Sequence, residues 1–392
     1  MSPSTKVFSL EGKGLKLDTA EDIEPHIKAL NDMEDVEEVK ILGNTLGVGA
    51  CKRLGEVLAT KQNLKIANFA DIFTGRLLNE IPEALSSLLT SILNLPKLNT
   101  IDLSDNAFGI NTHAPLVAFL AEHVPLQHLY LNNNGLGPHC GILIANSLSK
   151  LHEKKEEAKK EGKEVPDLET VICGRNRLEN GSMVAWAKAY RLHNKVKLVK
   201  MVQNGIRPEG ICHLLTSGLN QATELEVFNL QDNTFTLSGA KALAKAIIGW
   251  ENLRELGVGD CLLTGKGGLL LSEALAKGSN KKLETLRLQL ELNGNKFAEQ
   301  DPAILALESL LDGRKEEFGG DIVHEDDWGL DELDELDDDS DDEDEDDEGG
   351  LEPEELAEKL LKEAEEAMEE PTVQLKDKVV DQLAEKLEKT SI

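Results

Sequence analysis

Apolar residues recur along this chain in a fixed order, at the first, fourth and sixth places of a nine-residue stretch that closes on Asn. The pattern Leu-x-x-Leu-x-Leu-x-x-Asn is clearest at residues 98–106, 126–134 and 225–233. Weaker copies occupy residues 36–44, 64–72, 168–176, 196–204 and 253–261, and two of these close on Ile72 and Cys261 instead of Asn. Eight copies in one chain indicate an array of structural repeats.

The spacing of the copies defines the repeating unit. The closing positions are 44, 72, 106, 134, 176, 204, 233 and 261, so the steps are 28, 34, 28, 42, 28, 29 and 28 residues. This is a 28-residue unit with one insertion after Ile72 and another after Asn134. In each unit the short alternating segment predicts a strand, and apolar i, i+3, i+4 spacing predicts a helix in the rest, as at residues 82–89 and 239–248.

One strand and one helix per unit predict a curved solenoid. No unit can bury its Leu face alone, so the units must stack, with parallel strands on the concave side and helices on the convex side. The predicted fold class is therefore α/β, a leucine-rich-repeat horseshoe of the ribonuclease-inhibitor-like type. The closing Asn is expected to satisfy backbone groups at each turn, with Ile72 and Cys261 as the exceptions.

The regular pattern ends after Cys261. A fragment with Leu283, Leu286 and Leu288 runs directly into a second one with Leu290 and Leu292, without the helix that should separate them. We predict a solenoid over residues 1–318, a disordered acidic tail over 319–350, and a helical segment over 351–392 that either docks on a partner or is mobile.

Charge narrows the range of partners. The formal net charge is −31, and 15 of the 73 acidic residues lie between positions 331 and 348. The negative electrostatic field of such a chain repels phosphate groups. Nucleic acid and anionic lipid are therefore disfavoured as ligands, and a basic protein partner is favoured. For the tail alone, solubility is an equally good explanation.

The remaining composition is that of a protein from a reducing compartment. The five cysteines are odd in number, widely spread and mostly embedded in apolar patterns, which predicts reduced core thiols. The N-terminus has no apolar signal core, and no stretch of about 18 apolar residues occurs. A soluble intracellular protein is expected.

Local signatures of an active site are weak. Residues 264–268 (TGKGG) suggest a phosphate loop, but no Ser or Thr follows Lys266 and no Gly lies five residues before it, so we interpret them as the turn entering a repeat helix. His139 and Cys140 are adjacent without zinc-site spacing, and His193 and His213 are isolated, which favours surface or packing roles.

Five longer segments stand out from the generic repeat: residues 71–76 (DIFTGR), 129–138 (LYLNNNGLGP), 172–181 (ICGRNRLENG), 201–210 (MVQNGIRPEG) and 230–236 (LQDNTFT). They resemble, in the same order, segments of the Ran GTPase-activating proteins of fungi. With the acidic tail, the resemblance covers residues 6–345. It implies an activator that acts on the active site of its partner, binding Ran in its GTP form and accelerating hydrolysis without an arginine finger. Ran would supply its own catalytic Gln, and GTP and Mg would belong to Ran, so the chain would need no cofactor of its own.

Asn133 is the candidate catalytic residue. It lies between Leu131 and the closing Asn134, at the C-terminal edge of a predicted strand, where its amide can donate to and accept from a partner Gln. From the repeat alone it would be interpreted as a second turn-stabilising Asn. The resemblance reverses this preference and implies that Asn133 positions the Gln of Ran.

Arg76 is the first candidate contact to the partner. It begins the six-residue surplus after Ile72, on an elongated loop at the same edge as Asn133, two repeats away and so on the order of 10 Å distant at ~4.8 Å per strand. A loop Arg is usually solvated, but the resemblance makes Arg76 an essential contact to Ran that orders its switch regions.

Further partner contacts are expected on neighbouring units. Arg175 and Arg177 flank Asn176, and Asp102, Asp105 and Asp232 lie on neighbouring strands or turns, where a solvated face is an equally good explanation. Relatives have about one more repeat where this chain joins Gln289 to Leu290. We expect this difference to affect the stability of the C-terminal cap before it affects chemistry.

The resemblance also predicts cellular context. A monomer is expected in the cytoplasm, or close to the outer nuclear envelope, acting in nucleocytoplasmic transport and binding Ran-GTP alone or together with a Ran-binding protein, with no nucleic acid and no membrane insertion. The alternative is a passive leucine-rich-repeat scaffold that binds a protein without changing any rate. A scaffold needs only a concave face that binds a protein, whereas an activator needs rim residues that point toward the nucleotide pocket of its partner.

Overall fold

The computed structural model describes residues 6–109, 112–285, 289–291 and 353–369, with single helical residues at 302, 305, 306, 308, 309, 312 and 313. The predicted acidic tail, 319–350, lies outside the described residues, as do the last apolar positions at 379–387.

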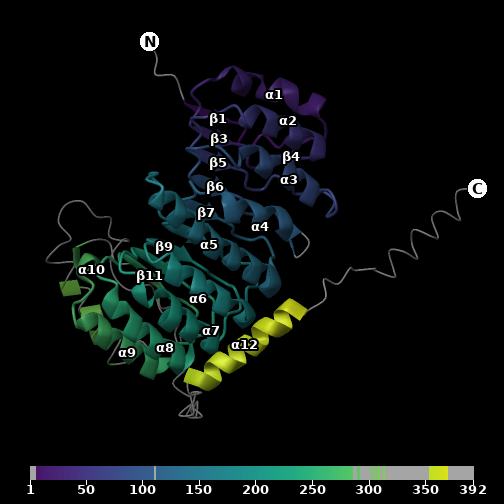
Figure 1. Cartoon of the computed structure of the whole chain (residues 1–392). Coiled ribbons are helices and arrows are strands. Elements are labelled where there is room, and N and C mark those ends of the chain that lie inside the picture. The colour runs from purple at the N-terminus through teal and green to yellow at the C-terminus, as the bar shows by residue number, and fades with distance from the viewer. Residues whose placement is uncertain are drawn as a thin grey trace, which may run out of the picture.

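A parallel sheet runs through the molecule and has ten strands among the described residues (Figure 1). Its strands follow chain order: β1 (Val7–Ser9), β3 (Glu38–Lys40), β5 (Ile66–Asn68), β6 (Thr100–Asp102), β7 (His128–Tyr130), β8 (Thr170–Ile172), β9 (Leu198–Lys200), β10 (Val227–Asn229), β11 (Glu255–Gly257) and β12 (Gln289–Glu291). The short strands β2 (Lys16–Leu17) and β4 (Thr45–Leu46) pair separately. Fourth-place residues such as Ile101, Leu129 and Val171 lie side by side in register, as the repeat requires.

Helices cover the other side of the sheet (Figure 1). They are α1 (Ala20–Asp32), α2 (Val48–Leu58), α3 (Ile81–Ile92), α4 (His113–Glu122), α5 (Gly137–Lys160), α6 (Met183–Leu192), α7 (Pro208–His213), α8 (Thr236–Ala246), α9 (Thr264–Ala276) and the short α10 (Lys281–Thr285). Consecutive helices pack against each other, as α2 does on α3 and α4 on α5. The predicted horseshoe of parallel strands and outer helices is therefore confirmed.

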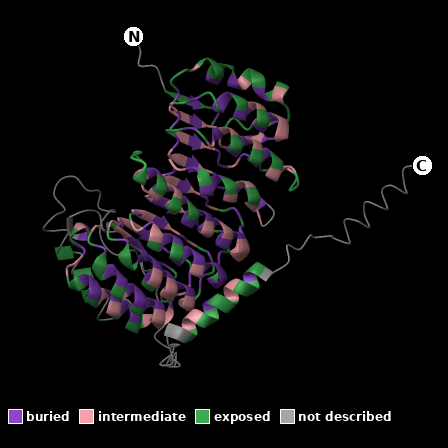
Figure 2. Cartoon of the chain, in the orientation of Figure 1, coloured by how far each residue is buried: buried purple, intermediate pink, exposed green. Residues whose placement is uncertain are grey.

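The core is a single layer between the sheet and the helices (Figure 2). First-, fourth- and sixth-place residues are fully buried, as Leu126, Leu129 and Leu131 show. Each unit contributes side chains from the same three positions of the repeat to this layer. The core therefore extends along the whole array of stacked units.

The closing Asn side chains form a ladder that ties each turn to the next. Asn134 donates from Nδ2 to the carbonyl oxygens of Leu103 (3.0 Å) and Leu131 (3.1 Å), and its Oδ1 accepts from the N–H of Asn106 (3.0 Å). Asn106, Asn176, Asn204 and Asn233 repeat this arrangement. At Cys261 the thiol donates to the Leu230 carbonyl oxygen (3.4 Å) instead. The predicted role of the closing Asn is confirmed.

Replacing Asn204 by Ala should lower the free energy of unfolding by about 2–4 kcal/mol, because buried partners lose their hydrogen bonds. Its side chain accepts from the Asn176 N–H and donates to the carbonyl oxygens of Cys173 and Met201. Urea unfolding measures the change. The control is Asn252→Ala, which removes one exposed hydrogen bond to Thr223. Equal losses in the two variants would contradict a structural role for the ladder.

The second insertion lengthens α5 to 24 residues and is closed by a buried lysine. Lys155 is 1% exposed, and its Nζ donates to the carbonyl oxygens of Val124, Leu126 and Pro166, each at 2.7 Å. Burial lowers the pKa of Lys155 to about 7, while three acceptors favour the ammonium form, which has three N–H groups to donate. The insertion is therefore packed against the preceding repeat.

At the C-terminal end of the sheet, the strand β12 (Gln289–Glu291) spans the junction of the two compressed fragments. Leu290 in β12 lies in register with Leu256 in β11. The first fragment contributes Leu283, which is fully buried in α10, and residues 286–288 lie outside the description. The sheet thus continues past Cys261 with only α9 and α10 between its last two strands.

One helix from the C-terminal segment packs on the solenoid. Helix α12 (Pro353–Glu369) lies along the amino ends of α5, α6 and α7 and contacts the turn at Asn180–Ser182 (Figure 1). It buries Leu360 and Ala367 there, and Lys359 forms an ion pair with Glu209. The apolar spacing predicted this helix but not its position. The boundary of the 351–392 segment stays a prediction.

Replacing Gly181 by Leu should detach α12. A Cβ atom at Gly181 would lie 3.0 Å from the Glu363 carbonyl oxygen and 3.2 Å from the Ala367 Cβ, and the nearest atoms all belong to α12. We expect amide hydrogen exchange across 353–369 to accelerate at least tenfold, as exchange does where a docked element opens. The control is Gly249→Leu, where the nearest atom would be 3.9 Å away. Unchanged protection in the Gly181 variant would contradict the docking.

Candidate partner-binding rim

The residue before each closing position has a left-handed backbone. The φ angles are 73° at Gly43, 48° at Asp71, 60° at Asp105, 53° at Asn133, 55° at Arg175, 53° at Gln203, 55° at Asp232 and 51° at Asp260. Only Gly adopts this conformation without cost, and Asn and Asp tolerate it better than other residues. From Asp105 onward these side chains are exposed. We call this series at the C-terminal edge of the sheet the rim column, and it contains Asp105, Asn133, Arg175 and Asp232 of the predicted site.

Asn133 is held by its neighbours but does not itself stabilise the turn. Its backbone N–H donates to the Gly174 carbonyl oxygen (2.9 Å), and its Nδ2 donates to Oδ1 of Asp105 (2.9 Å). The buried turn contacts belong to Asn134. Within the described part of the chain, Oδ1 of Asn133 has no donor, so this exposed amide is oriented by Asp105 and can still accept from a partner.

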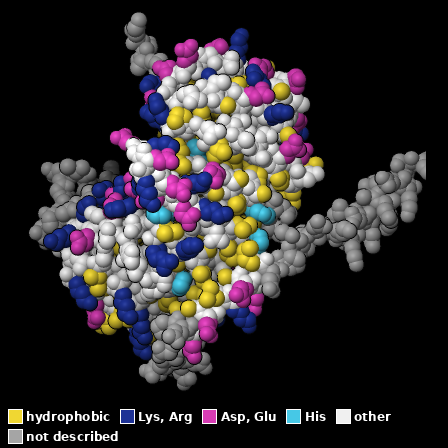
Figure 3. Space-filling view, in the orientation of Figure 1, with side chains coloured by type: hydrophobic (Ala, Val, Ile, Leu, Met, Phe, Trp, Pro, Cys, Tyr) yellow, Lys and Arg dark blue, Asp and Glu magenta, His cyan; other side chains and the backbone are white. Residues whose placement is uncertain are grey.

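The rim arginines contrast with the charges at the opposite edge. Arg175 and Arg177 are exposed at φ 55° and 54°, and neither forms an ion pair with a described residue. Just before the strands, by contrast, Lys197 pairs with Glu169 (3.0 Å) and Arg254 with Glu226 (3.5 Å). Figure 3 shows basic and acidic side chains interleaved over the sheet. The guanidinium groups of Arg175 and Arg177 are thus available at the rim to pair with a partner.

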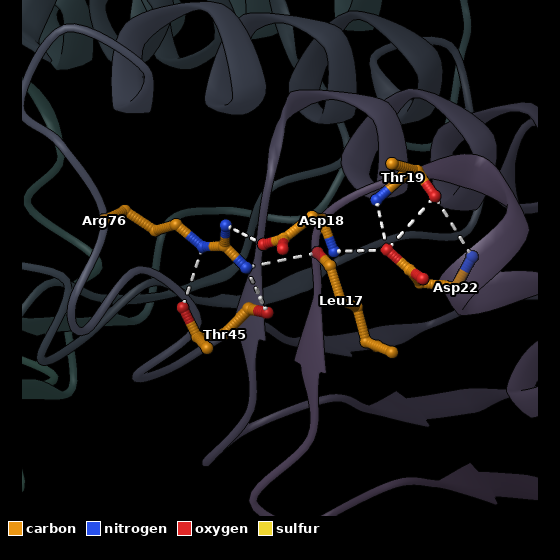
Figure 4. Close-up of polar contacts among 6 residues, drawn as sticks. All are labelled: Leu17, Asp18, Thr19, Asp22, Thr45 and Arg76. Carbon is orange, nitrogen blue, oxygen red and sulfur yellow. Dashed lines mark hydrogen bonds and ion pairs between the residues drawn. The ribbon is translucent and has the colours of Figure 1, made fainter.

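Arg76 lies on the predicted loop, between β5 and α3, but its side chain is turned inward (Figure 4). Only 8% of the side chain is exposed. The guanidinium donates from Nε to the Thr45 hydroxyl (2.9 Å), from Nη2 to the carbonyl oxygens of Thr45 (2.9 Å) and Leu17 (3.2 Å), and pairs through Nη1 with Asp18. Arg76 therefore clamps its loop to the β2–β4 pair.

The elements around this clamp are preformed. Asp22 accepts at the start of α1 from the backbone N–H groups of Asp18 (3.0 Å) and Thr19 (2.9 Å), and these bonds lower the pKa of Asp22. Gly47 leaves room for the contact between Asp18 and Arg76, since a Cβ there would lie 2.7 Å from the Asp18 carbonyl oxygen and 3.2 Å from Nη1 of Arg76. Asp18 and Thr45 could not be predicted as partners of Arg76, because they precede it by 58 and 31 residues and share no motif with it.

Asp102, another predicted contact, lies on the strand β6 and not in the rim column. Its partner in the sheet register is Tyr130 of β7. Burial raises the pKa of Asp102, while the Ser104 N–H, which donates to its Oδ1 at 2.9 Å, opposes this shift. Asp102 therefore offers a carboxylate on the concave side, beside the column.

Other chemistry considered from the sequence has structural roles. Thr264 and Lys266 lie in the first turn of α9, as predicted. Four of the five cysteines are buried, and burial raises the pKa of Cys51, Cys140, Cys173 and Cys261 to about 12. Among the described residues, no three His, Cys, Asp or Glu side chains are grouped to hold a metal ion, and no helix is long and apolar enough to cross a bilayer.

Comparisons with known proteins give a consistent set of relatives. The chain is 37% identical over 344 residues to Ran GTPase-activating protein 1 of Saccharomyces cerevisiae, covering 78% of this chain and 82% of the yeast protein. It is 41% identical over 202 residues to the protein of the same name from Xenopus laevis, which is 51% of this chain and 34% of the frog protein. No family model matches. Among solved structures, an internalin of Listeria monocytogenes aligns at 14% identity and a TM-score of 0.35, over 70% of this chain and 72% of that one.

Proposed function

Because the chain belongs to the family of Ran GTPase-activating proteins, we propose that it binds Ran in its GTP form and accelerates the hydrolysis of that GTP. The chemistry takes place in the active site of Ran, which supplies GTP, Mg and the catalytic Gln. The proposed activator needs no cofactor of its own. Its contribution is to position groups that already belong to its partner.

The exposed amide of Asn133 is the observation that carries this proposal. It stands on the rim at a fixed backbone angle, is oriented by Asp105, and keeps its Oδ1 available. Phosphoryl transfer depends mainly on positioning and electrostatics, so fixing the Gln that aims the attacking water can raise the rate by several powers of ten. Asn133 is proposed to accept from the amide of that Gln and hold it in place.

The clamped geometry of Arg76 supports activation without an arginine finger. An arginine finger must extend from its loop to reach the transferred phosphoryl group. The guanidinium of Arg76 instead makes its hydrogen bonds inside the fold, to Leu17, Asp18 and Thr45. We propose that Arg76 supports the loop that faces the switch regions, and that Arg175, Arg177 and Asp232 contact the partner along the rim.

The wider context is part of the same proposal. The chain acts as a monomer in nucleocytoplasmic transport, in the cytoplasm or close to the outer nuclear envelope. It binds Ran-GTP alone or with a Ran-binding protein, and its strong negative charge disfavours nucleic acid as a ligand.

A passive scaffold is the rival function, and one assay separates the two. Single-turnover hydrolysis of GTP by Ran is measured with and without the intact chain, at concentrations that saturate binding. Acceleration by several powers of ten supports an activator. Binding of Ran-GTP without acceleration would leave a scaffold.

A further inference from the structure

The loop between β5 and α3 presents two exposed leucines. Leu77 and Leu78 are each 65% exposed, more than any other large apolar side chain of the described residues; the next is Leu361 at 50%. They follow Arg76 directly, within the six-residue insertion that the 28-residue unit does not need.

This loop is firmly built, so poor packing does not explain the exposure. The Arg76 clamp holds it from one side, and Thr74 donates to the Asp71 carboxylate. Backbone bonds from Arg76 to Phe73 and from Glu80 to Leu77 close its turns, each at 3.0 Å. Buried Phe73 and Ile81 fix its two ends.

Two adjacent leucines held in water on a rigid support are typical of a binding surface. Exposed apolar side chains gain most when a partner removes them from water, and a preorganised loop loses little entropy in doing so. The loop is also continuous with the candidate rim, because β5, β6 and β7 are neighbours in the sheet and Asn133 follows β7. The loop and Asn133 are thus on the order of 10 Å apart at ~4.8 Å per strand.

We propose that Leu77 and Leu78 are an apolar anchor for Ran-GTP, packing on an apolar patch beside its nucleotide pocket. This inference rests on the proposed function and extends it to the residues that supply affinity. The anchor contributes to binding, whereas Asn133 contributes to the rate once Ran is bound. Arg76 connects the two by holding the anchor in place.

The test is the double variant Leu77→Ser, Leu78→Ser, assayed for Ran-GTP hydrolysis across a range of Ran-GTP concentrations. We expect the half-saturating concentration to rise about 10- to 100-fold, with the maximal rate within about twofold of the intact chain. The thermal midpoint should not change, because both side chains are already exposed. The matched control, Ile248→Ser with Leu269→Ser, removes two exposed apolar side chains from the helical side.

The possible results separate this inference from the proposed function. An unchanged half-saturating concentration, an equal rise in the control, or a lower maximal rate at unchanged half-saturation would each overturn the anchor alone. Failure of the intact chain to bind Ran-GTP would overturn the proposed function and the anchor together.

Discussion

Replacing Asn133 by Gly should lower the maximal rate of GTP hydrolysis by Ran, measured in the presence of the chain, by about 10²–10³-fold, the usual effect of losing one preorganised group in a transition state. The half-saturating concentration should change much less. The Asn133 side chain is exposed and bonds only to Asp105 among the described residues, so its loss should leave the core intact and remove the proposed contact with Ran. Single-turnover hydrolysis at saturating activator measures the effect.

Gly is chosen over Ala because Asn133 has a φ of 53°. Ala would add backbone strain to the loss of the amide, whereas Gly43 shows the same position filled by Gly at 73°. The control is Asp260→Gly, in the same column beside β11, which lies four strands from β7. A fall in rate shared by both variants, or full activity in the Asn133 variant, would reject the assigned role of Asn133.

Most of the fold could be predicted because the repeat makes it a local problem. A strand, a turn and a helix recur every 28 residues, and each packs mainly on the unit before and after it, so the order of the strands is the order of the chain. The buried ladder could be predicted for the same reason, since a polar side chain among buried turns must be hydrogen-bonded. The place of Asn133 at the edge of the sheet followed from its position one residue before the ladder, whereas its role in positioning the Gln of Ran was implied only by the family resemblance and stays a prediction.

Contacts that do not follow the repeat could not be predicted. Arg76 meets Asp18 from 58 residues away, and Lys359 meets Glu209 from 150 residues away. Neither pair leaves a periodic signal in the sequence, because each joins two surfaces that are placed by the rest of the solenoid. The apolar stripe of α12 likewise predicts a helix. Its packing against Gly181, however, can be found only from the structure.

The exposed leucines of the 74–80 loop are a second feature that the sequence pattern could not predict. Leu77 and Leu78 are apolar, so a pattern of polarity alone would place them with the core. In this loop Arg76 instead occupies the inward position, where its guanidinium makes four hydrogen bonds, while the two leucines that follow it are exposed. A charged side chain inside and apolar side chains outside reverse the usual placement, as expected where a loop serves the proposed contact with a partner.

Replacing Arg76 by Ala should lower both stability and activation. The guanidinium donates to Leu17, Thr45 and Asp18 with little exposure, so its loss should cost about 2–3 kcal/mol of unfolding free energy. Activation should fall at least about tenfold, because the clamped loop is proposed to face the partner. Urea unfolding and the Ran hydrolysis assay measure the two effects on the same samples. Arg76→Lys should recover only part of the lost stability and activation, since one ammonium group cannot donate to all the acceptors that the planar guanidinium reaches.

Changing the acceptors of the clamp shows whether Arg76 acts through its loop or touches Ran. Asp18→Ala combined with Thr45→Val removes the carboxylate and the hydroxyl that hold the guanidinium, without touching Arg76. If Arg76 positions the loop, this pair should lower stability and activation in the same direction as Arg76→Ala, and adding Arg76→Ala should cost little more, as for residues that act as one unit. If Arg76 instead leaves the clamp to contact Ran, weakening the clamp makes the guanidinium more available, and activation should be kept or increased while stability falls. Since the side chain is 8% exposed with its donors engaged, we expect the first result.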